Sequence, residues 1–186
     1  MPRTAAPRKD GGLSWAEIGW YATGMRLLGV DFGQRRIGLA LSDDTALLAR
    51  PWRSLAAGVT PAESATGVAD VVGACRADAD VGPIQAVVVG LPRRLNGSDT
   101  DQTQPARDFA QALAALTGLD VHLQDERLSS HEADARLAER EPDWRRRKAQ
   151  LDAASAAIIL QDYLDERGPR AGSAAAGDRG QATKDR

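Results

Sequence analysis

Two apolar, glycine-containing segments near the start of the chain constrain its fold most. Residues 26–33 read RLLGVDFG and residues 35–43 read RRIGLALSD, with only a short turn between them. A connection this short cannot hold the helix that a parallel crossover needs, so the two segments predict an antiparallel hairpin. Residues 50–56 predict a third strand at a sheet edge, because Pro51 has no amide hydrogen to donate to a neighbour.

The rest of the chain alternates helices and strands. Residues 61–75 have helical spacing behind Thr60 and Pro61, which are typical of a helix start. Residues 84–89 are an uninterrupted apolar, β-branched run, which indicates a strand covered on both faces. The later predicted elements are a helix that starts between Ser98 and Thr103 and ends at Gly118, a strand at 119–123, a helix at 130–139, a charged loop at 140–148 and a helix at 149–167. This order predicts an α/β fold: a mixed five-stranded sheet with helices on both faces.

The two ends of the chain differ in composition from its middle. Residues 1–24 mix proline, glycine, arginine and alanine, and residues 168–186 contain no apolar residue larger than alanine. We therefore expect a flexible N-terminal extension and a disordered C-terminal tail. A chain of 186 residues is long enough for one good core, which we assign to a single domain at 25–167.

Composition narrows the cellular setting more than the function. The chain has 24 basic and 26 acidic residues, a formal charge of −2, which neither demands nor excludes a nucleic-acid partner. No apolar run approaches the roughly 20 residues of a membrane span, and the N-terminus lacks a secretory apolar stretch. The single cysteine, Cys75, cannot form an internal disulfide and is expected to be a small core residue. We expect a soluble, cytoplasmic protein with no membrane partner.

Three acidic residues stand where chemistry is expected. Asp31 lies at the end of the first strand, Glu126 closes the last strand, and Asp152 falls on the inward face of the final helix. A turn aspartate, a loop acid and a helix N-cap are the ordinary alternatives. If the three converge, two carboxylates about 4 Å apart repel by about 4 kcal/mol at an effective dielectric of 20. Such a cluster takes up protons or cations, and oxygen-only ligands favour Mg²⁺ or Mn²⁺, the ions of phosphodiester hydrolysis.

Four segments together carry a family resemblance. They are GVDFGQRRIGLALSD, VVVGLPRRLNGS, QDERLSS and LDAASAAIIL, in this order between residues 26 and 167. The chain thereby resembles the YqgF/RuvX family, the pre-16S ribosomal RNA nucleases of bacteria, which are related to Holliday junction resolvases of the RuvC type. The resemblance implies an RNase H-like fold, and it implies that Asp31, Glu126 and Asp152 form the catalytic triad that binds Mg²⁺ or Mn²⁺.

Basic and glycine residues near these acids are the candidate substrate contacts. Gly33 and Gly38 are expected to keep the hairpin clear for a nucleic-acid backbone, unless they only form a tight turn. The loop that begins at Gly90 is expected to border the cleft. Arginines at such a rim would hold phosphates without reading bases, although a charge run is often only a solvated face. The predicted nucleic-acid contacts are Arg35, Arg36, Arg93, Arg94, Arg127, Arg146, Arg147 and Lys148.

Several functions remain compatible with these residues. The resemblance implies a metal-dependent endonuclease that matures the 5′ end of precursor 16S ribosomal RNA, with ribosomal particles as possible partners. The alternative is a resolvase of four-way DNA junctions, which would need two active sites and hence a homodimer rather than a monomer. A non-catalytic RNA-binding assembly factor is a third possibility. An ATP-binding module is a fourth, because the Asp31–Gly33 hairpin resembles a phosphate loop, but such modules need two domains.

Overall fold

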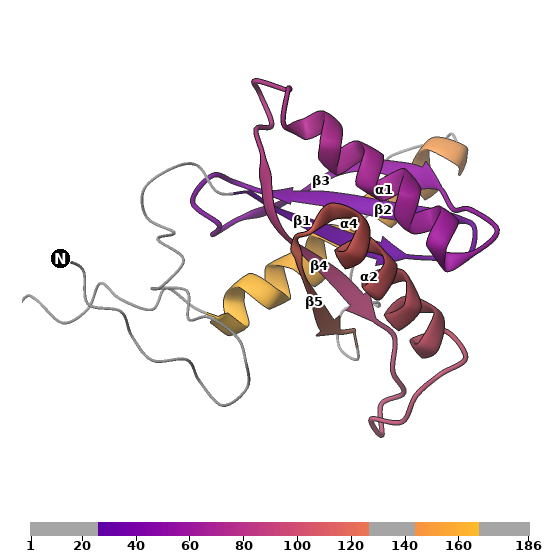
Figure 1. Cartoon of the computed structure of the whole chain (residues 1–186). Coiled ribbons are helices and arrows are strands. Elements are labelled where there is room, and N and C mark those ends of the chain that lie inside the picture. The colour runs from indigo at the N-terminus through magenta and orange to yellow at the C-terminus, as the bar shows by residue number, and fades with distance from the viewer. Residues whose placement is uncertain (1–25, 127–143, 168–186) are drawn as a thin grey trace, which may run out of the picture.

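The computed structural model describes residues 26–126 and 144–167. Figure 1 shows its elements in chain order, which are β1 Arg26–Phe32, β2 Arg36–Ser42, β3 Ala49–Ala56, α1 Pro61–Cys75, β4 Ile84–Leu91, α2 Thr103–Thr117, β5 Asp120–Asp125 and α4 Trp144–Arg167. Every strand and the first two helices of the sequence prediction are confirmed. Both predicted tails, Arg127 and the predicted helix at 130–139 lie outside the described residues. None of the helices within the described residues is both long and apolar enough to cross a membrane.

The strands form one mixed sheet in the order β3-β2-β1-β4-β5. The pairs β1–β2 and β2–β3 are antiparallel, as short connections require, whereas β1–β4 and β4–β5 are parallel. Pro51 lies on the edge strand β3, as predicted, at a register shift where Ala40 pairs with Pro51 and Leu39 with Arg53. The predicted five-stranded mixed sheet is thus confirmed.

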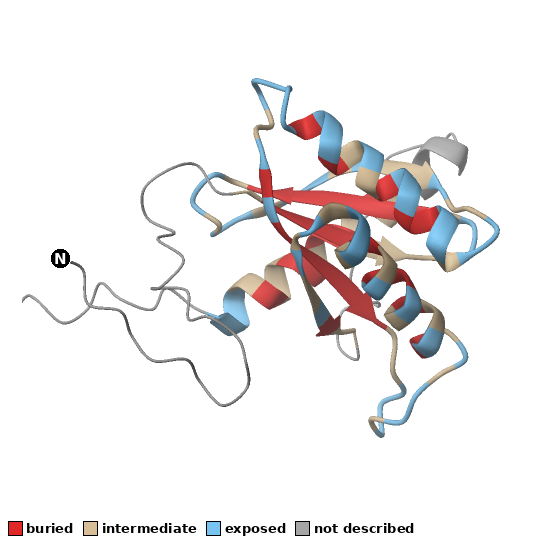
Figure 2. Cartoon of the chain, viewed as in Figure 1, coloured by how far each residue is buried: buried red, intermediate tan, exposed pale blue. Residues whose placement is uncertain are grey.

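The two faces of the sheet are covered by different helices, because side chains alternate along each strand. Leu28, Val30 and Val89 lie in one core cluster with residues of α1 and α2, among them Phe109. The neighbouring strand positions form a second cluster with α4, which contains Leu27, Ala40, Ala86, Val88, Ala156 and Leu160. Figures 1 and 2 show this arrangement, with buried residues concentrated on the strands and the inner helix surfaces. Cys75 is 3% exposed in the first core, as expected for a small core residue.

The last helix begins earlier than the sequence predicted. It starts at Trp144 rather than at residue 149, so Arg145, Arg146, Arg147 and Lys148 belong to its first turns and not to a loop. Arginine and lysine are strong helix formers, and the last proline before the helix is Pro142, so nothing interrupts a helix here. The N-cap alternative for Asp152 is therefore wrong, because this residue lies well inside α4.

Glycines let α4 lie directly on the sheet. A Cβ atom at Gly38 would collide with the backbone carbonyl of Asp152, and one at Gly29 would lie 2.7 Å from the carbonyl oxygen of Ala156. The expectation that Gly38 leaves room for a nucleic-acid backbone is therefore wrong, because α4 fills this space. Gly33 serves the tight turn between β1 and β2, where its amide donates to the Arg36 carbonyl at 3.1 Å.

Candidate active site

Asp31 faces α4 because of its position along β1. Leu27 belongs to the α4-side core and Gly29 contacts α4, so Asp31, two residues further on, points to the same face. Asp31 is paired with Gly38 on β2, and Gly38 with Ser54 on β3. These three residues form one row across the sheet at the end of β1.

Glu126 reaches the same face from the β5 edge of the sheet. It follows β5 directly, and its amide donates to the carbonyl of Leu91 at 3.3 Å. Its carboxylate lies over Gly90, where a Cβ atom would occupy the position of the Glu126 Oε1 atom. The sequence suggested Gly90 only as part of a loop border, whereas the structure gives it a specific role: it leaves room for an acidic side chain.

Asp152 enters the site from α4 and is held by two polar side chains. Its Oδ2 atom accepts a hydrogen bond from the Arg36 Nε atom at 2.8 Å and one from the Ser54 hydroxyl at 3.2 Å. The Arg36 Nε atom is also 3.1 Å from the Ser54 Oγ atom, so the three side chains form a closed triangle. The side chain of Asp152 is 21% exposed. Arg36 thus contacts an acid of the site instead of projecting only toward solvent.

Burial and neighbouring charges raise the pKa of two of the three acids. Burial and, second, the charge of Asp152 raise the pKa of Asp31 to about 6. Burial, followed by the charges of Asp31 and Asp125, raises the pKa of Glu126 to about 7. Asp31 is therefore coupled to both other acids and lies electrostatically between them. Such a cluster can hold extra protons near neutral pH or compensate its charge with a cation.

The three acids are of the chemical type that binds a hard divalent cation, but their present spacing does not suit one. Carboxylate oxygens are the ligands that Mg²⁺ and Mn²⁺ prefer. Within residues 26–126 and 144–167, however, no three His, Cys, Asp or Glu side chains stand close enough together to hold a metal ion. The Oδ2 atom of Asp152 is directed toward Arg36 and Ser54.

The other predicted basic residues lie in three different places. Arg35 and Arg94 are exposed, and the Arg93 Nε atom lies 3.6 Å from Asp99 Oδ1. Arg146, Arg147 and Lys148 occupy the first turns of α4. Arg127 is outside the described residues. Among the predicted basic contacts that the structure describes, Arg36 is the one that forms an ion pair with a predicted catalytic acid.

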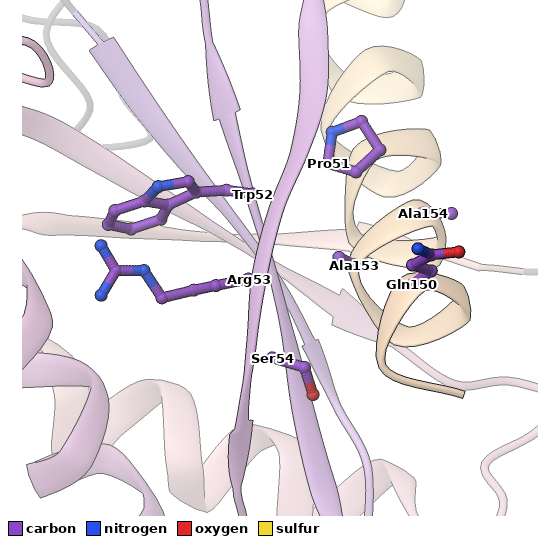
Figure 3. A pocket seen from close by; sticks show the side chains of 7 residues that line it. All are labelled: Pro51, Trp52, Arg53, Ser54, Gln150, Ala153 and Ala154. Atoms are coloured by element: carbon purple, nitrogen blue, oxygen red, sulfur yellow. The ribbon is translucent and has the colours of Figure 1, made fainter. Parts of the chain in front are cut away.

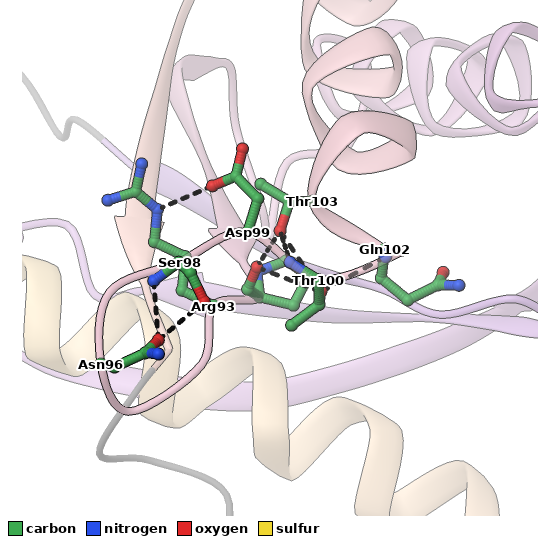
Figure 4. Close-up of polar contacts among 8 residues, drawn as sticks. Arg93, Asn96, Ser98, Asp99, Thr100, Gln102 and Thr103 are labelled. Atoms are coloured by element: carbon green, nitrogen blue, oxygen red, sulfur yellow. Dashed lines mark hydrogen bonds and ion pairs between the residues drawn. The ribbon is translucent and has the colours of Figure 1, made fainter.

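A hydrogen-bonded loop follows β4 (Figure 4), and the Glu126 amide donates to the carbonyl of Leu91, the last residue of β4. Thr103, fully buried, donates from its hydroxyl to the Pro92 carbonyl at 2.5 Å and accepts from the Thr100 amide at 2.8 Å. At the tip, the Asn96 side chain accepts from the Ser98 amide at 3.0 Å. Because the loop begins at the residue after Leu91, these bonds fix the chain beside Glu126. Sequence reasoning missed both Thr103 and Ser54, since their partners are known only once the strands and helices are packed.

A mixed sheet in this order, with one acid ending β1, one following β5 and one on the last helix, defines an α/β domain of the RNase H-like class, as the resemblance implied. The family model described as "RuvX: Holliday junction resolvase" matches residues 25–166. The chain belongs to this family.

Two curated relatives, each matched over most of its length, agree with this assignment. The chain is 42% identical over 143 residues to a protein of Anaeromyxobacter sp. (strain Fw109-5) named "Putative pre-16S rRNA nuclease", a match covering 77% of this chain and 98% of the relative. A protein of the same name from Koribacter versatilis (strain Ellin345) is 40% identical over 143 residues, covering 77% and 88%. Among solved structures, T. thermophilus RuvC in complex with Holliday junction substrate is similar with a TM-score of 0.46 and 16% identity, covering 78% of this chain and 96% of that chain.

Proposed function

We propose that this protein is a metal-dependent endonuclease that hydrolyses phosphodiester bonds, and that its substrate is the 5′ region of precursor 16S ribosomal RNA. The observation that carries the proposal is the placement of Asp31, Glu126 and Asp152 on the α4 face of the sheet, near enough for the charge of Asp152 to act on Asp31 and that of Asp31 to act on Glu126. These acids come from distant parts of the chain, and their coupling costs folding free energy that a purely structural role does not explain. The names of the curated relatives support the choice of RNA.

Asp31, Glu126 and Asp152 are the residues proposed to hold Mg²⁺ or Mn²⁺. When bound, such an ion lowers the pKa of water and stabilises the oxygen that leaves the phosphate. Arg36 and Ser54 orient the Asp152 carboxylate, and their hydrogen bonds to Oδ2 leave Oδ1 directed elsewhere. We propose that the remaining basic residues hold the phosphates of the strand on either side of the cut. These residues are Arg35, Arg93, Arg94, Arg127, Arg146, Arg147 and Lys148. Precursor ribosomal particles of the cytoplasm are the proposed setting.

A second candidate function is cleavage of four-way DNA junctions. The description of the matching family model, Holliday junction resolvase, favours it. The same acids would serve, but symmetrical cleavage needs two copies of the chain. Sedimentation of the protein with and without a four-way junction tests this requirement directly.

The proposed function is tested by cleavage assays with purified protein. Wild type, Asp31→Asn and Asp152→Asn are incubated with Mg²⁺ or Mn²⁺ on an RNA that spans the 5′ end of 16S ribosomal RNA and on a four-way DNA junction. Asp70→Asn is the matched control, because Asp70 is an exposed acid on α1, on the opposite face of the sheet. We expect wild type and the control to cut the RNA, and both site variants to lose at least about a hundredfold in rate, as loss of a metal-held charge predicts.

Three results would contradict the proposal. Undiminished cleavage by either site variant would show that the three acids do not form a catalytic triad. Cleavage of the junction but not of the RNA would show that the substrate is four-way DNA and not precursor RNA. An RNA that binds wild type and Asp31→Asn equally well, with no cleavage by either, would instead support a non-catalytic assembly factor.

A further inference from the structure

A pocket lies between the edge strand β3 and the first half of α4. Its volume is about 480 Å³, within the roughly 300 to 1,000 Å³ of ligand pockets in proteins. Figure 3 shows Pro51 on the side of β3 that faces α4, opposite Gln150 and the two alanines. The residues lining it are Pro51, Trp52, Arg53, Ser54, Gln150, Ala153 and Ala154. No residue of the proposed catalytic triad is part of this lining.

The pocket nevertheless adjoins the acidic site through Ser54. Ser54, which lines the pocket, donates to the Asp152 carboxylate at 3.2 Å. Gln150, Ala153 and Ala154 line it from α4 immediately before and after Asp152. Ser54 also stands in the row of residues that leads through Gly38 to Asp31. A strand whose phosphate lies at the acids would therefore have a neighbouring nucleotide at the mouth of this pocket.

The side chains of the pocket suit a flat aromatic ring with polar edges. Pro51, Ala153 and Ala154 offer only hydrocarbon, and small side chains leave space for a planar group. The exposed Gln150 amide can both donate and accept hydrogen bonds, which matches the mixed donor and acceptor edges of nucleobases. Pockets for extruded bases combine apolar side chains against the face of the base with hydrogen bonds to its edge.

Positive charge lies beside the pocket. Arg53 is exposed, and its guanidinium carbon lies 3.5 Å from the centre of the Trp52 ring, so the indole holds the cation in place. In Figure 3 this pair lies on the other side of β3 from α4. The first turns of α4, just before Gln150, carry Arg145, Arg146, Arg147 and Lys148.

We propose that the β3–α4 pocket binds one base of the strand that the acidic site cuts, at a nucleotide close to the cut. This inference rests on the nuclease function proposed above and adds a subsite to it. The base lies between Pro51 and the alanines of α4, and Gln150 bonds its edge. The pocket thereby sets which phosphate of the strand lies at the acids.

The proposal is tested with a short single-stranded RNA centred on the cut mapped in the assay above. Its affinity is measured by fluorescence anisotropy with Ca²⁺ in place of Mg²⁺, and each base near the cut is removed in turn to leave an abasic nucleotide. Wild type is compared with Ala154→Phe, which fills the pocket, and with Gln150→Ala, which removes the amide at an exposed helix position. The matched control is Ala115→Phe, because Ala115 is exposed on α2 and lies on the other face of the sheet. Circular dichroism checks the folding of each variant.

We expect one abasic position to weaken binding to wild type by about tenfold, because removal of the base removes its apolar contacts with Pro51 and the alanines of α4. Ala154→Phe should bind intact RNA more weakly than wild type by the same factor, and removal of that base should not weaken its binding further. Gln150→Ala should bind intact RNA about threefold more weakly than wild type. Ala115→Phe should behave as wild type. Such non-additivity between protein and RNA changes is not produced by a general disturbance of α4.

Two results would overturn the pocket while leaving the nuclease function intact. One is equal affinity of wild type for all abasic RNAs. The other is that Ala154→Phe and Gln150→Ala both lose as much affinity as wild type does when the base at that position is removed. If wild type binds neither intact nor abasic RNA, the RNA substrate and this subsite both fail.

Discussion

The charge of Asp31 is expected to destabilise the folded protein when no cation is bound. Burial and the charge of Asp152 raise the pKa of Asp31 from its ordinary 3.8 to about 6. Each pH unit corresponds to 1.36 kcal/mol, so keeping this group ionised in the folded state costs about 3 kcal/mol. Replacement of Asp31 by asparagine, which has the same shape and no charge, should therefore stabilise the protein at neutral pH by up to about 3 kcal/mol.

The sign of the pH dependence follows from the raised pKa. Below about pH 4 the group is protonated in both the folded and the unfolded state, so it costs nothing. As the pH rises from about 4 to about 6, the unfolded state gives up its proton while the folded state still holds it, so stability falls, and above about pH 6 the loss is complete. Glu126, with its pKa raised from 4.5 to about 7, adds a second loss in the same direction. Wild type without metal should therefore be more stable near pH 5 than near pH 8.

Urea unfolding followed by circular dichroism in EDTA measures these differences. The free energy of unfolding of wild type and Asp31→Asn is determined near pH 4 and near pH 8, with Asp70→Asn as the exposed control. We expect Asp31→Asn to have a higher free energy of unfolding than wild type near pH 8 and the same value near pH 4. The control should differ from wild type by no more than about 0.5 kcal/mol at either pH. An equal gain at both values, or a loss near pH 8, would refute the reasoning, because neither follows from a buried, repelled charge.

Three further substitutions test the contacts that build the site. Arg36→Gln should destabilise the metal-free protein by about 1 kcal/mol in urea unfolding, because it leaves the half-buried Asp152 carboxylate without its cation; unchanged stability would show that the pair contributes nothing. Gly38→Ala should lower the melting temperature sharply and slow cleavage, because its methyl group collides with the α4 backbone at Asp152; full stability would mean that α4 can move away. Thr103→Val should cost about 1–3 kcal/mol in urea, because the Pro92 carbonyl loses its shorter hydrogen bond and the Thr100 amide loses its acceptor; no loss would show that these bonds are dispensable.

Gly67→Ala is the control for Gly38→Ala. Gly67 lies within α1 with no neighbouring atom within 4 Å of an added Cβ atom. Alanine favours helix over glycine by about 0.5–1 kcal/mol, so this variant should be as stable as wild type or slightly more stable. The opposite signs of the two Gly→Ala changes separate a close approach of backbones from a general effect of glycine replacement.

The sequence predicted the sheet well because its signals are local. The hairpin follows from the short turn after Phe32, and β4 from an apolar, β-branched run. Thr60 accepts from the Glu63 amide at 3.2 Å, as the predicted helix start requires. The start of α4 was mispredicted because a run of arginines was interpreted as a solvated loop, although arginine is a good helix former.

The candidate site was predictable only in part. An acid at a strand end or on the inner face of a helix can be seen in a sequence, so Asp31, Glu126 and Asp152 could be singled out. Ser54 could not, because its contact with Asp152 depends on a β2–β3 register that contains a shift beside Pro51. The role of Arg36 was also hidden, since its partner is 116 residues away in the chain.

The small residues of the α4 face explain why these acids share one neighbourhood at all. A strand normally contributes a side chain to each face, and those side chains hold a covering helix away from the backbone. Here Gly29 and Gly38 bring the α4 backbone against β1 and β2, and Gly90 makes room for the Glu126 carboxylate. Each glycine removes apolar contacts that would stabilise the core, and the acids that fill the space repel one another. A face optimised for stability alone would carry larger apolar residues at these positions, so the pattern is better explained by selection for where the acids lie.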